Sequence, residues 1–316
     1  MAGRADPRFA AVREIIAAEH AAEPPRRAAE MAAAIAEKHG SSVSAFVFYG
    51  SGLRQADDPE KMLDYYVLVD RYISVHGAGP RAFASFALPP SVHYHAATDS
   101  SGAFMSSKYS IISTDAFLRR AAGRAREPMI WARFSQPCLV MACKTPALRD
   151  RLIDALALAV LHFADTVRPL MSGPVTPRDF WARALAESYR TELRAERPYE
   201  RAGEIVDRYA ARYEALAVAA LGPMDATGCI HLEAAGAPQL LATRISWALR
   251  RWVGKPATAG RVLKAAFTFD GGLDYVLHKL ETHSGVTIPV SDHQRRHPLL
   301  WSPLLAWRLW RRGAFR

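Results

Sequence analysis

Two short stretches in the first quarter of the chain carry residue types suited to holding a phosphorylated ligand. The first, YGSG at residues 49–52, places Ser51 between two glycines directly after the apolar run VSAFVFY. The second starts at Asp64, with eleven residues between it and Gly52, and continues as YYVLV. Glycines let backbone N–H groups approach a triphosphate closely, and a serine hydroxyl can donate to a phosphate oxygen. A carboxylate can hold the Mg²⁺ that neutralises such phosphates.

Each stretch is weak when taken alone. Gly-Ser-Gly turns connect strands in many proteins, and an aspartate at the start of a strand can simply cap a turn. Asp64, however, is the only charged residue between Met62 and Val69, beside a run expected to be buried. Together the two stretches favour a strand, a phosphate-binding turn and a second strand that begins with a metal-binding carboxylate.

The surrounding elements follow from apolar periodicity and turn signals. Residues 1–39 are expected to be helical, with a helix that Pro24-Pro25 opens and Gly40 ends. Strands are expected at residues 43–49, 63–69 and 108–113, with a fourth candidate at 138–142. From Thr145 the pattern becomes helical, and helices are expected over about 146–168, 177–196 and 203–221.

The expected fold class is therefore α+β. A mixed sheet with flanking helices is followed by a helical domain and a basic C-terminal tail. The expected domains are residues 1–145 with the sheet, 146–253 with the helices, and 254–316 as a basic, aromatic segment. The glycines of the turn are expected at the mouth of a cleft, with the helical domain as its other wall.

The strand–turn–strand pattern resembles the polymerase-β-like nucleotidyltransferases. Within them it resembles the mitochondrial translocator-assembly-and-maintenance family of phosphatidate cytidylyltransferases. YGSGLRQ is similar to that family's YGSG turn with its following glutamine, and MLDYYVLV to its M-[IL]-D-[FL]-[IV]-F-x-V strand. Three later stretches are similar in the same order: KYSIIS at 108–113, SYRTELR at 188–194 and RVLKAAFT at 261–268. The resemblance covers about residues 40–272.

The resemblance implies that CTP and phosphatidic acid react to give CDP-diacylglycerol and pyrophosphate, with Mg²⁺ as cofactor. It implies nucleotide binding by Gly50, Ser51, Gly52, Gln55, Tyr189 and Arg194. It implies catalytic roles for Asp64, Lys108 and Glu192, with Asp64 and Glu192 as metal ligands. A phosphate monoester is already a competent nucleophile, so positioning and charge neutralisation suffice for such a reaction.

The chain departs from the family pattern at a few positions. Glu192 stands where the family usually has Asp, and Thr191 stands where it has Gly. The wider superfamily often places a second carboxylate two residues after the first, and here that position is Tyr66. The second metal ligand is thus open. Without the resemblance, Lys108 is as well explained as a solvated lysine, and Glu192 as a partner of neighbouring arginines.

Two other functions remain open on the sequence alone. One is a nucleotidyltransferase that acts on another phosphorylated or phosphonylated acceptor. The other is a non-catalytic nucleotidyltransferase fold that binds membranes or RNA, which the presence of Ser51, Asp64 and Lys108 disfavours. The pairs His93/His95 and His293/His297 have zinc-like spacing but lack a third ligand, so ordinary histidines are favoured.

The positive charge of the chain is concentrated at its C-terminal end. The net charge is +10, and residues 241–316 hold 13 Lys and Arg against 4 Asp and Glu. The end of the chain reads LLWSPLLAWRLWRRGAFR, and tryptophan with arginine suits the headgroup level of a bilayer. An anionic membrane surface is therefore the expected partner, with no specific nucleic acid. The residues expected to bind membrane or phosphate are Arg261, Lys264, Arg308, Arg311 and Arg312.

A peripheral location on the cytoplasmic membrane surface is expected. The longest apolar stretch, residues 155–164, is too short to span a bilayer, and three cysteines without a CxxC pair fit a reducing compartment. Two alternatives for the basic end stay open. It can be a terminal helix packed on the core, or an element whose arginines attract nucleic-acid phosphate.

Overall fold

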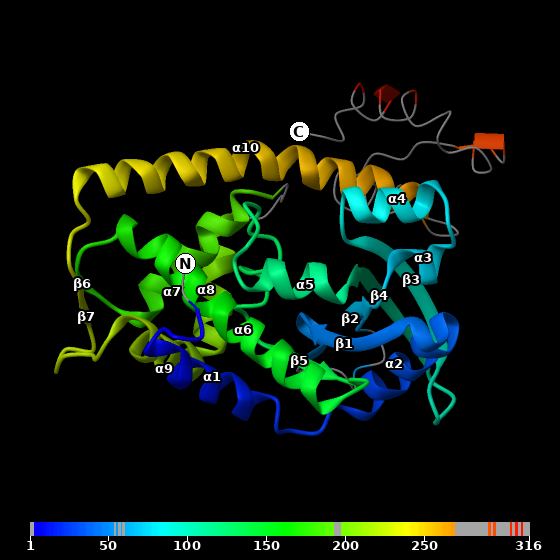
Figure 1. Ribbon diagram of the computed structural model, residues 1–316, viewed down its shortest axis with the longest axis horizontal. Helices are drawn as coiled ribbons and strands as arrows, with labels where there is room; N and C mark the ends of the chain where they lie inside the picture. The colour runs from blue at the N-terminus through cyan, green and yellow to red at the C-terminus, as the bar shows by residue number, and fades with distance from the viewer. Residues whose placement is uncertain are drawn as a thin grey trace.

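The computed structural model describes most of the chain up to residue 268 and single positions beyond it. Described are residues 3–53, 55, 58, 61–192, 197–268, 290, 291, 293, 294, 304, 307, 308 and 311. The described part has the expected mixed α+β architecture, with helices on both sides of one larger sheet (Figure 1). This arrangement is consistent with a nucleotidyltransferase-like fold.

The larger sheet has the strand order β3-β4-β2-β1-β5. Its strands are β1 (Val43–Tyr49), β2 (Leu63–Val69), β3 (Ser91–Thr98), β4 (Phe104–Ser113) and β5 (Cys138–Met141). β2 and β4 run parallel, whereas the other neighbouring strands are antiparallel. The first two strands have the expected bounds because they are buried on both faces and read as continuous apolar runs. β3 was not among the expected strands; it lies at the edge of the sheet, and its second half is largely exposed.

The two faces of this sheet pack against different helices. On one face, Phe46, Tyr65 and Val67 pack against Met31 and Ile35 of α2. The other face is covered by α5, α6 and the segment that follows α5. The helices are α1 (Arg8–Glu19), α2 (Arg26–His39), α3 (Tyr72–His76), α4 (Pro80–Ala87), α5 (Thr114–Ala121), α6 (Pro146–Val167), α7 (Pro177–Tyr189), α8 (Pro198–Arg208), α9 (Ala210–Leu221) and α10 (Ala237–Thr268). β6 (Gly173–Val175) and β7 (Ile230–Leu232) form a small second sheet.

Several expected helix bounds are wrong. The helix expected over 177–196 ends at Tyr189 as α7, and the one expected over 203–221 is two helices. The first is α8, which begins at Pro198, and the second is α9. The break between them lies at Tyr209. The first part of the segment expected at 254–316 is helical, because α10 continues through Pro256 to Thr268. None of the described helices is both long and apolar enough to cross a membrane.

The sheet and the helical half share one apolar core. A single cluster joins Val47 and Tyr66 of the sheet with Leu156 of α6 and Leu185 of α7. The first helix, α1, packs against α6 and α9. The change near residue 145 therefore separates two kinds of secondary structure within one core, and the boundary expected at 253 falls inside α10.

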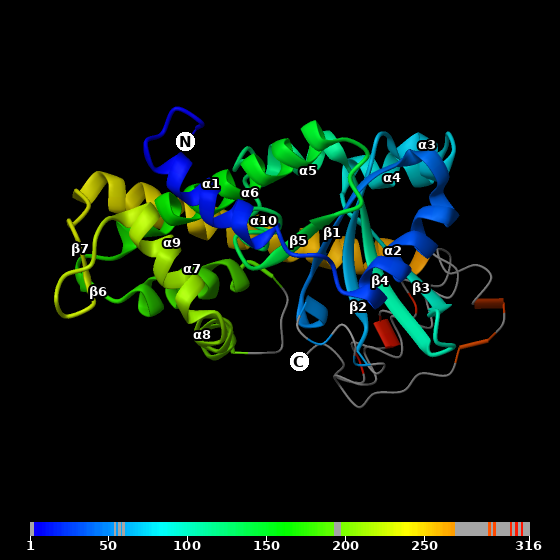
Figure 2. The ribbon, with the colours of Figure 1, turned by 90° about the horizontal axis from the view of Figure 1, so that it is seen from below.

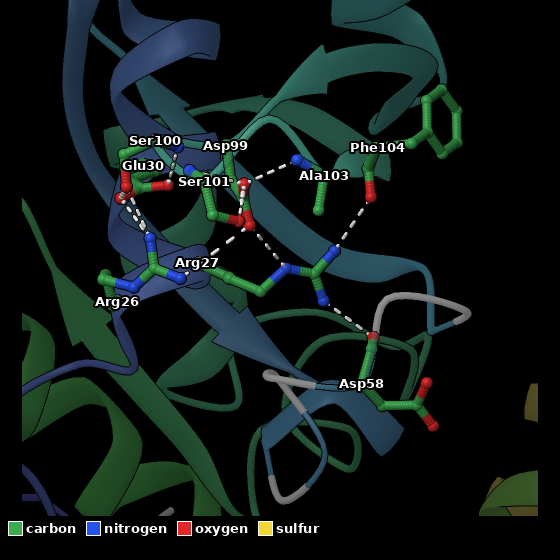
Figure 3. A network of polar contacts seen from close by, with 9 residues as sticks. All are labelled: Arg26, Arg27, Glu30, Asp58, Asp99, Ser100, Ser101, Ala103 and Phe104. Carbon is green, nitrogen blue, oxygen red and sulfur yellow. Dashed lines mark hydrogen bonds and ion pairs between the residues drawn. The ribbon is translucent and has the colours of Figure 1, made fainter.

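A buried arginine ties α2 to the loops that flank β2 and β4 (Figure 3). Arg27 is 3% exposed, and its guanidinium donates to the carbonyl oxygens of Asp58, at 2.7 Å, and Phe104, at 3.0 Å. It also pairs with the carboxylate of Asp99 at 3.5 Å. Asp58 lies between the Gly-Ser-Gly turn and Asp64, so this contact joins α2 to the chain just before β2.

Replacing Arg27 by methionine is expected to lower the free energy of unfolding by about 2 kcal/mol, because two carbonyl groups lose a charged donor. The neighbouring variant Arg26→Met is the control, since Arg26 also pairs with Asp99, at 3.8 Å, but its side chain is 55% exposed and its closer ion pair, with Glu30, lies at the surface. Urea unfolding followed by circular dichroism measures both variants. Equal losses in the two variants would contradict the anchoring role of Arg27.

Candidate active site

The strand register places three chemically useful side chains in one row. β1 and β2 pair Tyr49 with Asp64, and β2 and β4 pair Asp64 with Lys108. Directly paired residues point to the same face of a sheet, here the face covered by the helical half. The Nζ atom of Lys108 lies 3.2 Å from Oδ1 of Asp64. The structure thus brings the predicted carboxylate and the predicted lysine into contact.

The Gly-Ser-Gly turn lies directly against this carboxylate. Gly50 has a φ of +85°, and a Cβ atom added there would lie 3.0 Å from Oδ2 of Asp64. Both the positive φ and the short distance from an added Cβ atom to Asp64 therefore favour glycine at this position. Ser51 begins a short 3₁₀ turn over Ser51–Leu53. The turn, the carboxylate and the lysine form one wall of a cavity.

This cavity of about 280 Å³ lies between the sheet and the helical half. Figure 2 shows the sheet on one side, with α7 and α8 on the other. The lining residues are Tyr49, Gly50, Ser51, Asp64, Lys108, Arg133, Gln136, Pro137, Tyr189, Arg201, Ile205, Arg208 and Tyr209. The expected cleft with the glycine turn at one wall and helices at the other is thereby confirmed.

The charges of the cavity favour an anionic ligand. Among the described lining residues Asp64 is the only acidic one, whereas Lys108, Arg133, Arg201 and Arg208 are basic. One of these cations, Lys108, is compensated by Asp64, and Arg201 pairs with Glu204 on its own helix at 2.8 Å. A concave site with a basic excess raises the local concentration of phosphorylated ligands.

Arg133 joins the two walls of the cavity. Its guanidinium lies 5.6 Å from the centroid of the Tyr49 ring and 3.6 Å from Oε1 of Glu192. Burial opposes its charge, but Glu192 and the surrounding phenols raise the pKa of Arg133 above its usual value. Burial also raises the pKa of Tyr49 to about 12. At neutral pH the site therefore holds a fixed cation beside a protonated phenol.

The expected helical contributors are only partly placed in the cavity. Tyr189 lines it, and its hydroxyl donates to Oε1 of Gln136 at 3.3 Å. Glu192 follows the end of α7 and is outside the described lining, with its carboxylate against Arg133. The expected role of Glu192 as a metal ligand stays a prediction, and its contact gives it a second role as the counter-ion of Arg133. Arg194 lies outside the described residues.

Asp64 has the donor chemistry of a Mg²⁺ ligand. Its Oδ1 atom is buried and, among the described residues, accepts no hydrogen bond, although Lys108 lies close. Mg²⁺ is commonly held by one or two carboxylates together with substrate phosphates, so a single carboxylate beside a phosphate-binding turn fits. The described residues hold no cluster of three or more His, Cys, Asp or Glu side chains suited to a metal.

Two predicted phosphate-binding residues are structural instead. Arg261 and Lys264 are buried at 8% and 9% exposure. Arg261 donates to the carbonyl oxygen of Pro89 at 2.9 Å and pairs with Glu127, while Lys264 donates to that of Pro90 at 2.9 Å. Both cations thus fasten α10 to the turn after α4, and their expected membrane or phosphate role is wrong. Burial accordingly lowers the pKa of Lys264 to about 8.

Other predicted residues lie away from the cavity or beyond the described part. Gly52 is buried, where an added Cβ atom would lie 3.1 Å from the Phe48 ring, and Gln55 is exposed. Neither is among the lining residues. Arg308 and Arg311 are exposed, with Arg311 4.9 Å from the Trp307 ring, and Arg312 lies outside the described residues. His93 and His95 belong to β3, and the described residues place them in no metal site.

Three cavity arginines were not predicted. Arg201 and Arg208 are seven residues apart on α8, so they share a helix face with Ile205 between them. That periodicity is a readable signal, but the sequence does not reveal which face meets the sheet. Arg133 carries no local signal, because its role depends on contacts with β1 and with the end of α7.

No model of a known protein family matches the chain. A search of curated proteins likewise finds no match.

Replacing Gly50 by alanine is expected to destabilise the protein more than the same change at Gly102. Both glycines have a positive φ, +85° and +86°, so each variant loses about 1 kcal/mol to left-handed backbone strain. Only the Cβ atom at position 50 meets a carboxylate, whereas at 102 no described atom lies within 4 Å. We expect roughly 1 kcal/mol of additional loss at position 50, measured by urea unfolding. Similar losses at both positions would show that the turn and Asp64 are not in contact.

Proposed function

We propose that the protein is a Mg²⁺-dependent CTP:phosphatidate cytidylyltransferase, which forms CDP-diacylglycerol and releases pyrophosphate. The observation that carries the proposal is the cavity wall in which Ser51, Asp64 and Lys108 meet, although they come from different strands and a turn. The residues that line the opposite wall are mostly cationic or aromatic. A site of this composition suits two phosphorylated ligands placed side by side.

The sheet wall would hold the triphosphate. Backbone N–H groups of the turn and the hydroxyl of Ser51 would donate to phosphate oxygens, since Gly50 lets the backbone pass close to Asp64. Lys108 would place an ammonium beside the same phosphates. Bound Mg²⁺, held by Asp64 and the phosphates, would supply charge neutralisation of the leaving pyrophosphate.

The helical wall would hold the acceptor. A phosphate oxygen of phosphatidic acid attacks the α-phosphorus of CTP, the new P–O bond forms, and the bond to the β-phosphate oxygen breaks. Arg201 and Arg208 would orient the acceptor phosphate, with Ile205 as apolar surface between them. Arg133, fixed by Glu192, would face the charge that develops between the two ligands. The acceptor is already ionised, so no general base is required.

A lipid acceptor implies work at a membrane. The basic excess after residue 240 and the aromatic end of the chain support reversible docking at an anionic surface, with a peripheral cytoplasmic location. The basic side chains of the cavity would suit a phosphate group of any acceptor, which supports a second candidate. In that candidate the protein transfers a nucleotide to another phosphorylated or phosphonylated acceptor, and a panel of acceptors tested with CTP separates the two.

Replacing Asp64 by asparagine is expected to lower CTP-dependent pyrophosphate release by about 100-fold or more, because the metal-binding charge is lost at nearly constant volume. Asp70→Asn is the matched control, since Asp70 follows the far end of β2 and pairs with Lys144. Pyrophosphate is measured with phosphatidic acid vesicles, and circular dichroism verifies the fold. Near-normal release by the Asp64 variant would refute the metal assignment.

Replacing Arg208 by methionine is expected to raise the KM for the phosphorylated acceptor about threefold to fivefold, because one exposed phosphate contact is lost. The kcat and the KM for CTP are expected to change little. Arg197→Met serves as control, because Arg197 precedes the same helix but is outside the cavity lining. A change confined to the KM for CTP would place the acceptor elsewhere.

A further inference from the structure

The outward face of α10 carries an apolar stripe that the protein core does not use. Its residues, which are between 51% and 83% exposed, are Leu241, Ile245, Leu249, Trp252 and Val253. Their spacing repeats about every four residues, so they lie along one side of the helix over three turns. Figure 1 shows α10 along one border of the molecule, from the small second sheet to α4.

The opposite face of α10 explains why this stripe stays outside. Trp247 is buried, and its ring nitrogen donates to the carbonyl oxygen of Thr166 at 3.0 Å. Gly254 lies so close to Thr191 that an added Cβ atom would collide with its carbonyl oxygen. Together with Arg261 and Lys264, these contacts fix the rotation of the helix about its axis. The apolar stripe is therefore held outward by the fold.

The charge of α10 identifies the kind of surface that would meet this stripe. Residues 237–268 contain no Asp or Glu, and four of their six Lys and Arg contact the rest of the fold: Arg250, Arg251, Arg261 and Lys264. Arg244 and Lys255 are exposed beside the stripe, on one flank of it. An apolar face with a basic flank suits the headgroup region of an anionic bilayer. A second copy of the same face is a poor partner, because antiparallel pairing would bring like charges together.

We propose that the outward face of α10 is a docking surface for anionic lipid membranes, with Trp252 at its centre. The helix packs against the wall of the candidate active site, because Gly254 touches Thr191 and Arg251 pairs with Glu187 of α7 at 3.1 Å. Docking through α10 therefore holds the helical wall of the cavity near the lipid surface. This proposal rests on the proposed function, because a docking surface of this kind would bring the enzyme to its lipid substrate. Vesicle binding can nevertheless be measured separately from enzymatic activity.

The test compares two valine-to-glutamate variants of the full chain. Val253→Glu places a carboxylate in the stripe, and Val218→Glu places one on α9, where Val218 is also exposed. Flotation with vesicles of phosphatidylcholine and phosphatidylglycerol is expected to show about fivefold weaker binding for Val253→Glu. Val218→Glu is expected to bind like the unaltered chain. In Trp252→Phe, part of the lipid-induced blue shift of tryptophan fluorescence is expected to be lost.

Three outcomes would overturn the proposal. The first is equal binding by the two valine variants, with all vesicle binding lost on deletion of residues 299–316. The second is a dimer in light scattering that Val253→Glu dissociates, which would make the face a contact between copies. The third is that the chain ignores vesicles. Turnover of a short-chain, water-soluble phosphatidic acid distinguishes the two proposals. A variant that fails only in docking should retain this activity. If the proposed function is wrong, the unaltered chain will lack this activity as well.

Discussion

The parallel register between β2 and β4 is the constraint on which the candidate site depends. It sets Asp64 beside Lys108, and the antiparallel register of β1 sets Tyr49 on the other side of Asp64. A slip of one residue would move Lys108 to the face covered by α2. Parallel neighbours also need a crossover connection, here the stretch with α3, α4 and β3. The elements between the two strands therefore allow β4 to lie parallel to β2, with Lys108 beside Asp64.

The rest of the structure maintains that row of side chains. Arg27 contacts Asp58, shortly before β2, from the α2 side, and the shared apolar core holds α6 and α7 against the opposite face. As a result the helical wall and the sheet belong to the same apolar core. Lys108 balances Asp64, so the remaining arginines leave the cavity with a basic excess.

The sequence predicts this fold where local signals are strong. β1 and β2 are continuous apolar runs, and α6 and α7 start with a threonine cap followed by proline, so their starts are readable. α10 contradicts its local signals, because Gly254 and Pro256 would ordinarily end a helix. Contacts made across the fold, such as that of Gly254 with Thr191, keep it continuous. The cavity arginines were missed for the same reason, since only the packing of α8 and of the segment after α5 turns them toward Asp64.

The pairing of Arg133 with Glu192 changes how the proposed reaction distributes its charges. The guanidinium of Arg133 needs a counter-ion, because burial disfavours a lone charge. Glu192 supplies that counter-ion. Its carboxylate therefore interacts with Arg133, and Glu192 is outside the described cavity lining. Among the described residues that line the cavity, Asp64 is then the carboxylate available to a proposed ligand. Mg²⁺ bound with few protein ligands and several phosphate oxygens is the coordination that such a site can offer, and it agrees with the tyrosine at position 66, where the wider superfamily often has a second acid.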